Sequence, residues 1–301
     1  MSDRNLMSMP RVVASSALEE AVLERVFIGP PYFALRPVAW QDGLFGAQAQ
    51  LEAQDAVGLS PEAQMLRHAT LAGLCVGALT QPDDARRHYI VQEMHYVVQS
   101  APDTGQVELS AQVMDLDPRN LRAEIHVSNG AQLLASLNVL YTVLTSEAFE
   151  RLFARRRLVG QDEAADWCLP LPGGTLTHKA GALVREVDVL PPETCAGTSL
   201  GARALPASVL VGHLTALAAE LSDSPALLSS VGLQVNDLCW AGENLCFEVR
   251  AQEGAEAPAQ GQIQGQNSAQ AYAVSVHAGP HRRLAARGRL VLTRSLPRPL
   301  S

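Results

Sequence analysis

The chain has 301 residues, of which 47% are hydrophobic and 18% charged, and its formal net charge is −8. This length favours about two domains and allows each of them a substantial core. The excess of acidic residues argues against nucleic acid or an anionic membrane surface as the main partner.

The N-terminal part predicts a short helix, a hairpin and a long buried helix. The helix covers residues 17–25, and the hairpin joins residues 32–40 to 44–51 through an Asp-Gly turn. The long helix begins at Ser60, a plausible N-cap, and Pro61, which suits the first helical position. From residue 69 to 79 it is apolar on nearly every face, and we expect the protein to bury it because it is too short for a membrane span.

The segments that follow this helix have the alternation and turn signals of strands. A short amphipathic helix at residues 146–157 ends in cations, where the helix dipole favours them. Four antiparallel strands after one buried helix indicate a compact α+β module. The predicted strands are residues 87–98, 106–114, 121–127 and 132–144.

The second part of the chain repeats this order after a linker rich in proline and glycine. A second buried helix begins near Pro206, and a polar insertion covers residues 253–270. A repeat of about 145 residues indicates two copies of one domain. We therefore predict an N-terminal domain at 1–157, a linker at 158–182 and a C-terminal domain at 183–301. The predicted strands of the second copy are residues 183–190, 228–239, 245–252, 271–277 and 283–293.

One long buried helix wrapped by an antiparallel sheet, present twice, resembles a double hotdog protein. The sequence QMLRHATLA at 64–72 resembles the helix motif of β-hydroxyacyl-ACP dehydratases and of the A-factor biosynthesis hotdog family. LPASVLVG at 205–212 resembles the approach to that helix. The resemblance implies an α+β fold with two antiparallel sheets, each wrapped around a buried helix. It also implies a thioester substrate carried by acyl carrier protein or coenzyme A.

The chain departs from the dehydratase pattern at the residues that carry the chemistry. The motif's acidic position falls on Gln64 in the first half and on Gly212 in the second. The family's histidine would fall on Thr198. Dehydration needs one group to remove a proton and another to protonate the leaving hydroxyl. Since no acid–histidine dyad remains in register, we do not expect dehydration by this dyad.

The start of the first buried helix nevertheless holds three polar residues on neighbouring positions of one face. Gln64, Arg67 and His68 could converge on a thioester carbonyl, with His68 as acid or base and Gln64 as an orienting donor. The competing interpretation is a helix start whose polar groups are satisfied by neighbouring loops.

Further candidates are weaker. Arg67, His95, Thr198 and His213 are candidate substrate-binding residues, although His213 points to another face and fits a core histidine. Cys195 is a candidate nucleophile with no base nearby in the sequence. We expect Asp237 to face solvent.

The sequence leaves three functions open: acyl transfer or a related step in fatty-acid, polyketide or signal-molecule biosynthesis, thioester hydrolysis, and silent binding of acyl chains or a partner enzyme. It contains no spacing typical of a metal site and no phosphate-binding loop, so we expect no metal and no cofactor. The start of the chain lacks a secretory pattern, and five widely spaced cysteines fit reduced thiols, so we expect a cytoplasmic protein. Two hotdog units in one chain are compatible with a monomer or a homodimer.

Overall fold

The structure is a computed structural model that describes residues 16–30, 32–52, 59–102, 105–154, 174–195, 203–222, 226–252 and 269–294. In the N-terminal half a long helix, α3, is followed by four antiparallel strands, as the sequence predicts. The elements of this half are α1 (Ser16–Arg25), β1 (Val38–Gln41), β2 (Leu44–Gln50), α3 (Pro61–Thr80), β3 (Arg87–Val98), β4 (Gln106–Leu116), β5 (Asn120–Asn129), β6 (Gln132–Thr145) and α4 (Ser146–Phe153).

The C-terminal half repeats this arrangement around a second long helix, α5. Its first strand, β7, lies within residues 158–182, so the predicted linker extends too far. The tight turn at Ala180 and Gly181 then leads into β8. The elements of this half are β7 (Thr175–Lys179), β8 (Ala182–Val187), the 3-10 helix η1 (Pro192–Cys195), β9 (Ala204–Leu205), α5 (Ala207–Leu221), β10 (Ala226–Val235), β11 (Cys239–Trp240), β12 (Leu245–Ala251), β13 (Ala269–Ala278) and β14 (Arg283–Arg294).

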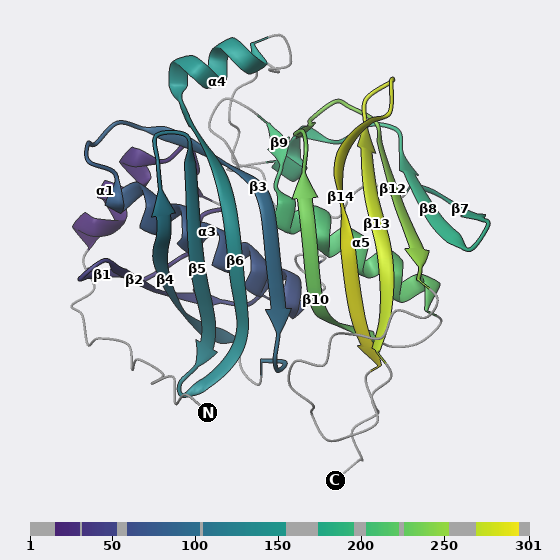
Figure 1. Cartoon of the computed structure of the whole chain (residues 1–301), viewed down its shortest axis with the longest axis horizontal. Helices are drawn as coiled ribbons and strands as arrows, with labels where there is room; N and C mark the ends of the chain where they lie inside the picture. Colours follow the sequence, from purple (N-terminus) through teal and green to yellow (C-terminus); the bar gives the residue numbers. More distant parts are fainter. Residues whose placement is uncertain are drawn as a thin grey trace.

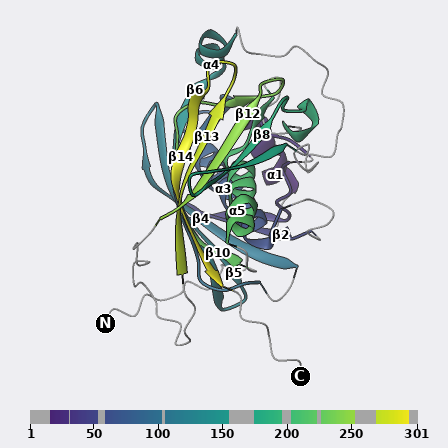
Figure 2. The same ribbon diagram turned by 90° about the vertical axis from the view of Figure 1, so that its right-hand side faces the viewer.

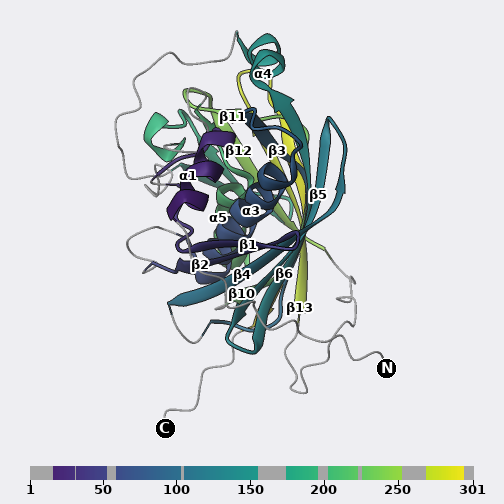
Figure 3. The same cartoon turned by 90° about the vertical axis from the view of Figure 1, so that its left-hand side faces the viewer.

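The two predicted sheets are joined into one. β3 and β10 pair antiparallel at the centre, so twelve strands run in the order β1-β2-β4-β5-β6-β3-β10-β14-β13-β12-β8-β7. Figure 1 shows this sheet in front of α3 and α5, and Figures 2 and 3 show both helices on the same side of it. Each half therefore covers its own helix, and the two helices meet at the junction between the halves.

Helix α3 is buried along almost its whole length, as the apolar pattern predicts. It begins as expected, with the Ser60 hydroxyl accepting a hydrogen bond from the backbone N–H of Ala63. On the side facing the sheet, Gly73 and Gly77 allow β5 and β6 to come close. A Cβ atom at Gly73 would lie 2.6 Å from the Tyr141 hydroxyl oxygen, so only glycine fits without a shift.

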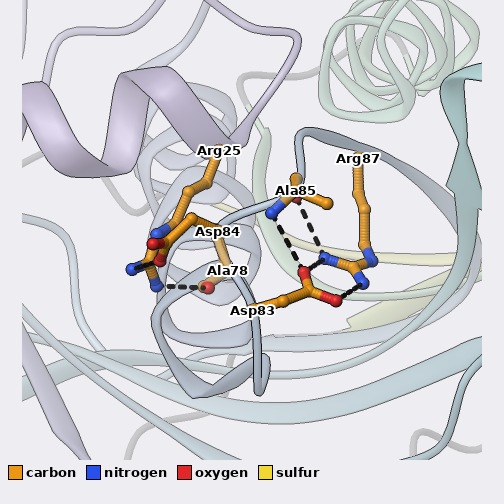
Figure 4. A network of polar contacts seen from close by, with 6 residues as sticks. All are labelled: Arg25, Ala78, Asp83, Asp84, Ala85 and Arg87. Carbon is orange, nitrogen blue, oxygen red and sulfur yellow. Dashed lines mark hydrogen bonds and ion pairs between the residues drawn. The ribbon is translucent and has the colours of Figure 1, made fainter.

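The C-terminal end of α3 is completed by residues outside the helix. Its last turn contains no basic residue, but Arg25 of α1 donates a hydrogen bond to the carbonyl of Ala78 and pairs with Asp84 (Figure 4). A cation at this end offsets the negative end of the helix dipole. In the same network Asp83 binds both terminal nitrogens of Arg87, at 2.6 and 2.9 Å, and fixes the start of β3.

We expect Gly73→Ala to lower the free energy of unfolding by about 2 kcal/mol. The added methyl would displace the Tyr141 hydroxyl, which donates a 2.7 Å hydrogen bond to the carbonyl of Thr70 inside the core. This cost exceeds the roughly 1 kcal/mol gained in helix propensity. Denaturant titration would measure the change. Gly232→Ala is the control, because a Cβ there meets its nearest atom at 4.0 Å; equal stability of the two variants would contradict the close packing at α3.

Candidate functional site

A pocket lies where the two halves meet, with a cavity of about 100 Å³. Its walls come from the middle of α3, the start of β3, the start of α5 and the segment that follows β10. Most of the wall is apolar, which suits a hydrocarbon chain. The apolar side chains include Val26, Ile28, Leu71, Leu74, Leu205 and Leu210.

Two hydroxyl groups meet in the wall of this pocket, one from each half. The Tyr32 and Ser208 oxygens lie 2.9 Å apart in a buried hydrogen bond. Thr70 also lines the pocket, but its hydroxyl donates to the carbonyl of Arg67. Tyr32 and Ser208 are therefore the hydroxyl pair best placed to meet a polar atom of a ligand.

The start of α5 forms another part of the wall. Its cap residue, Pro206, supplies no side-chain acceptor, and the first helical hydrogen bonds run from Val209 and Leu210 to the Pro206 carbonyl. The backbone N–H groups of Ala207 and Ser208, which precede these, have no acceptor within the helix. Such groups favour a ligand oxygen that carries negative charge.

Asp237 is the only carboxylate among the described residues that line the pocket. It follows β10 and is fixed from two sides. Arg283 lies 2.7 Å from Oδ2, and Oδ1 accepts a hydrogen bond from the backbone N–H of Leu238. The sequence interpretation that Asp237 faces solvent is therefore incomplete, because its side chain is 24% exposed and borders the pocket.

Gln64 does not line the pocket, and its amide fastens the chain instead. Its Oε1 accepts from the backbone N–H of Glu52, and its Nε2 donates to the carbonyls of Glu52 and Leu59. The side chain thus joins the backbone of Glu52 and Leu59 to the first turn of α3. This is the alternative interpretation, in which a neighbouring loop satisfies the helix start.

Arg67 is fully buried and acts on the pocket through Tyr32. Its Nε and Nη2 donate to the Tyr32 carbonyl, and its guanidinium carbon lies 5.2 Å from the centre of the Tyr32 ring. Its Nη1 is 3.8 Å from a Glu52 oxygen. Arg67 is therefore a positioning residue: it holds the backbone and ring whose hydroxyl contacts Ser208.

His68 is fully buried away from the described pocket wall. Among the described residues neither ring nitrogen makes a hydrogen bond of good geometry, although the backbone of Gln50 lies close enough to interact with the ring. Burial and, second, the charge of Arg67 lower its pKa to about 3, and the nearby backbone of Gln50 partly opposes this shift. The imidazole therefore stays neutral at physiological pH. The geometry does not bring it together with the residues of the pocket.

The remaining sequence candidates also lie elsewhere. His95 is exposed on β3, opposite Gly232 of β10. His213 is half-buried on α5, where burial and, second, the charge of Arg185 lower its pKa to about 4. Thr198 lies outside the described residues. Cys195 is buried outside the pocket wall.

Sequence reasoning missed Tyr32, Ser208 and the pocket position of Asp237. The sequence at the start of the second helix did contain a signal for Ser208. A proline at the cap position has no side-chain acceptor, so the first backbone N–H groups of the helix, next to Ser208, are left without a capping partner. Among the described residues no group of three or more histidine, cysteine or acidic side chains could hold a metal ion. No described helix has the length and apolar character needed to cross a membrane.

Comparison with known proteins gives matches among solved structures alone. No protein-family model matches the chain, and no curated protein is significantly similar to it. A protein assigned as an oleoyl thioesterase from Lactobacillus plantarum is 11% identical with a TM-score of 0.57, over 86% of this chain and 97% of that one. The 12:0-ACP thioesterase from Umbellularia californica is 10% identical with a TM-score of 0.55, over 84% and 94%.

A MaoC-like dehydratase is 10% identical with a TM-score of 0.50, over 80% of this chain and 87% of that one. These likenesses and the strand order confirm the hotdog fold, present here as a double hotdog. At such low identity they establish the architecture alone, so the chemistry has to be argued from the pocket.

We expect His68→Leu to weaken the pH dependence of stability. Below pH 6.5 the unfolded chain protonates His68, whereas the folded chain keeps it neutral down to about pH 3. The free energy of unfolding of the wild type therefore falls by up to ~1.4 kcal/mol per pH unit because of His68, as the pH drops from the unfolded-state pKa towards the folded-state pKa. Denaturant titrations at about pH 7.5 and about pH 5 would measure the difference. His95→Gln, which changes an exposed histidine, is the control. If the free energy of unfolding of His68→Leu changed with pH as much as that of the wild type, His68 would not be the buried neutral group responsible.

Proposed function

We propose that this protein hydrolyses acyl thioesters carried by coenzyme A or acyl carrier protein, at the pocket between its halves. The observation that carries the proposal is the composition of that pocket. An apolar wall meets the open start of α5, a buried hydroxyl pair and one fixed carboxylate in a single cavity. These are the parts that thioester hydrolysis needs: a place for the acyl chain, donors for an oxyanion and a base for water.

The acyl chain would lie against Leu71 and Leu74 of α3, with its carbonyl at the start of α5. The backbone N–H groups of Ala207 and Ser208 would face the carbonyl oxygen, and the Ser208 hydroxyl would stand beside them. Negative charge develops on this oxygen when the carbonyl carbon becomes tetrahedral. Donors already fixed by a buried helix stabilise that charge without reorganising.

Asp237 would act as the general base. Its carboxylate takes a proton from a water molecule while the water oxygen bonds to the carbonyl carbon. The carbon–sulfur bond then breaks, and the proton passes from Asp237 to the departing thiolate, giving an acid and a free thiol. Arg283 and the backbone N–H of Leu238 hold the carboxylate in place for this step.

The structural neighbours add support of a general kind. Two of them carry the name of acyl-thioester hydrolases, and both cover most of this chain. If a small alcohol took the place of water, the same pocket would transfer the acyl group. The reaction is therefore decided by the acceptor that reaches the carbonyl beside Asp237.

Silent binding of an acyl thioester is the second candidate. It is favoured by the contacts of Asp237, because Arg283 already lies against Oδ2 and the backbone N–H of Leu238 already donates to Oδ1, which leaves less of the carboxylate for a water molecule. No other carboxylate belongs to the described part of the pocket wall. Binding without turnover would then be the function of the same cavity.

Intact mass spectrometry of acyl, β-hydroxyacyl and β-ketoacyl thioesters on carrier protein, with a parallel coenzyme A series, tests the proposal. We expect loss of the acyl group without any added acceptor, because water is the acceptor. Loss that requires an added alcohol would indicate transfer. Protection of the thioesters without turnover would favour the binding candidate, and loss of water would indicate dehydration.

We expect Asp237→Asn to lower kcat at least about 100-fold with little change in KM, because an amide cannot take the proton from water. Asp115→Asn removes an exposed carboxylate on β4 and is the matched control. Steady-state kinetics with the thioester found active would measure both. An equal rate in Asp237→Asn and wild type would exclude Asp237 as the base.

A further inference from the structure

The pocket runs along α3 from a polar end to an apolar end. The residues that α3 contributes to its wall are Thr70, Leu71 and Leu74. The Tyr32 hydroxyl next to Ser208 marks the polar end. Arg67 holds Tyr32, and Leu74 lies about 10 Å further along the axis of the same helix. Since the carbonyl is proposed to lie beside Ser208, the acyl chain has to extend towards Leu74.

The apolar end is closed by residues that follow α1. Arg25 binds the carbonyl of Ala78 in the last turn of α3, and Val26 pairs with Arg87 at the start of β3. Val26 and Phe27 both line the pocket. The contact of Arg25 places them at the end of the cavity that faces the C-terminus of α3, where they stop an acyl chain.

A stack of rings forms the wall beside this end. The Phe27 and His88 rings are 3.9 Å apart and the His88 and Phe149 rings 3.7 Å apart, with interplanar angles of 4° and 8°. All three residues line the pocket. The guanidinium carbon of Arg86 lies 4.7 Å from the centre of the Phe27 ring, and Trp240 packs on Phe149 at 6.4 Å. A ring with partners on both sides loses those contacts if it swings aside, so this wall resists a longer chain.

The size of the cavity decides which acyl groups it holds. An apolar cavity of about 150 Å³ binds benzene, which corresponds to about 25 Å³ for each carbon atom. On this scale the cavity of about 100 Å³ holds about four carbon atoms. A chain of twelve carbons would need about 300 Å³, so it would have to displace the walls or leave the cavity.

We propose that the pocket takes short acyl groups of about four carbon atoms, and that Leu74 sets this limit. The proposal rests on the function proposed above, because it takes this pocket as the place of the acyl group. Leu74 is only 3% exposed and stands at the apolar end. A smaller side chain there lengthens the cavity and leaves Asp237 and the hydroxyl pair unchanged.

The test measures affinity by isothermal titration calorimetry. The probes are coenzyme A analogues with acyl groups from acetyl to dodecanoyl and a methylene between sulfur and carbonyl, so they cannot be hydrolysed. Each methylene that the wall buries tightens binding about fourfold, so we expect Kd to fall about 15-fold from acetyl to butanoyl. Because a longer chain overfills the cavity, we expect the dodecanoyl analogue to bind at least about 10-fold more weakly than the butanoyl analogue.

Leu74→Ala removes three carbon atoms from the end of the cavity. We expect the tightest analogue to shift from butanoyl to one about three carbons longer. Leu66→Ala is the matched control, because it makes the same change on the same helix at a buried residue outside the pocket wall. Its order of affinities should match that of the wild type. If circular dichroism shows that Leu74→Ala does not fold, Leu74→Val replaces it, with a shift of about one carbon.

The outcomes separate the size limit from the proposed hydrolysis. Tighter binding of the dodecanoyl than of the butanoyl analogue by the wild type would overturn the size limit and leave hydrolysis standing. An unchanged order in Leu74→Ala, or the same shift in Leu66→Ala, would overturn the role of Leu74. The expected order without turnover of any thioester would support the size limit and overturn hydrolysis. Failure of the wild type to bind any analogue or hydrolyse any thioester would overturn both.

Discussion

Burial of α3 on every side is the constraint from which the rest of the architecture follows. A helix with no polar stripe cannot lie on a surface, so the strands after it must wrap it, and α5 imposes the same demand on the second half. Pairing β3 with β10 meets both demands with a single sheet and protects two edges that would otherwise be exposed. The two helices then meet at the junction, where the pocket forms.

The polar residues at the start of α3 show how such burial restricts chemistry. Each buried polar atom has to find a partner or lose stability. Gln64 finds the backbone of Glu52 and Leu59, and Arg67 finds the backbone and ring of Tyr32. These contacts join α3 to the chain before it and, through Ser208, to the second half. Residues that resemble a catalytic set in the sequence therefore hold together the scaffold around the pocket.

His68 marks the other extreme. Among the described residues neither ring nitrogen has a hydrogen bond of good geometry, and burial keeps the imidazole neutral, so His68 makes the folded state less stable in acid. Asp237 has the opposite environment: it is partly exposed, it is held by Arg283, and it borders the cavity. The contrast is one of solvent access and neighbours, which residue type alone does not specify.

The sequence by itself determined the two buried helices and the succession of a helix and strands in each half, because apolar periodicity and turn residues are local signals, and this succession pointed to the double hotdog fold. It also determined the cap of α3 at Ser60 and Pro61. Only the tertiary structure decided which polar residues meet. Tyr32 and Ser208 are 176 positions apart, and their contact depends on how the halves dock. Pairing between β3 and β10 sets that docking, and no local pattern encodes its register.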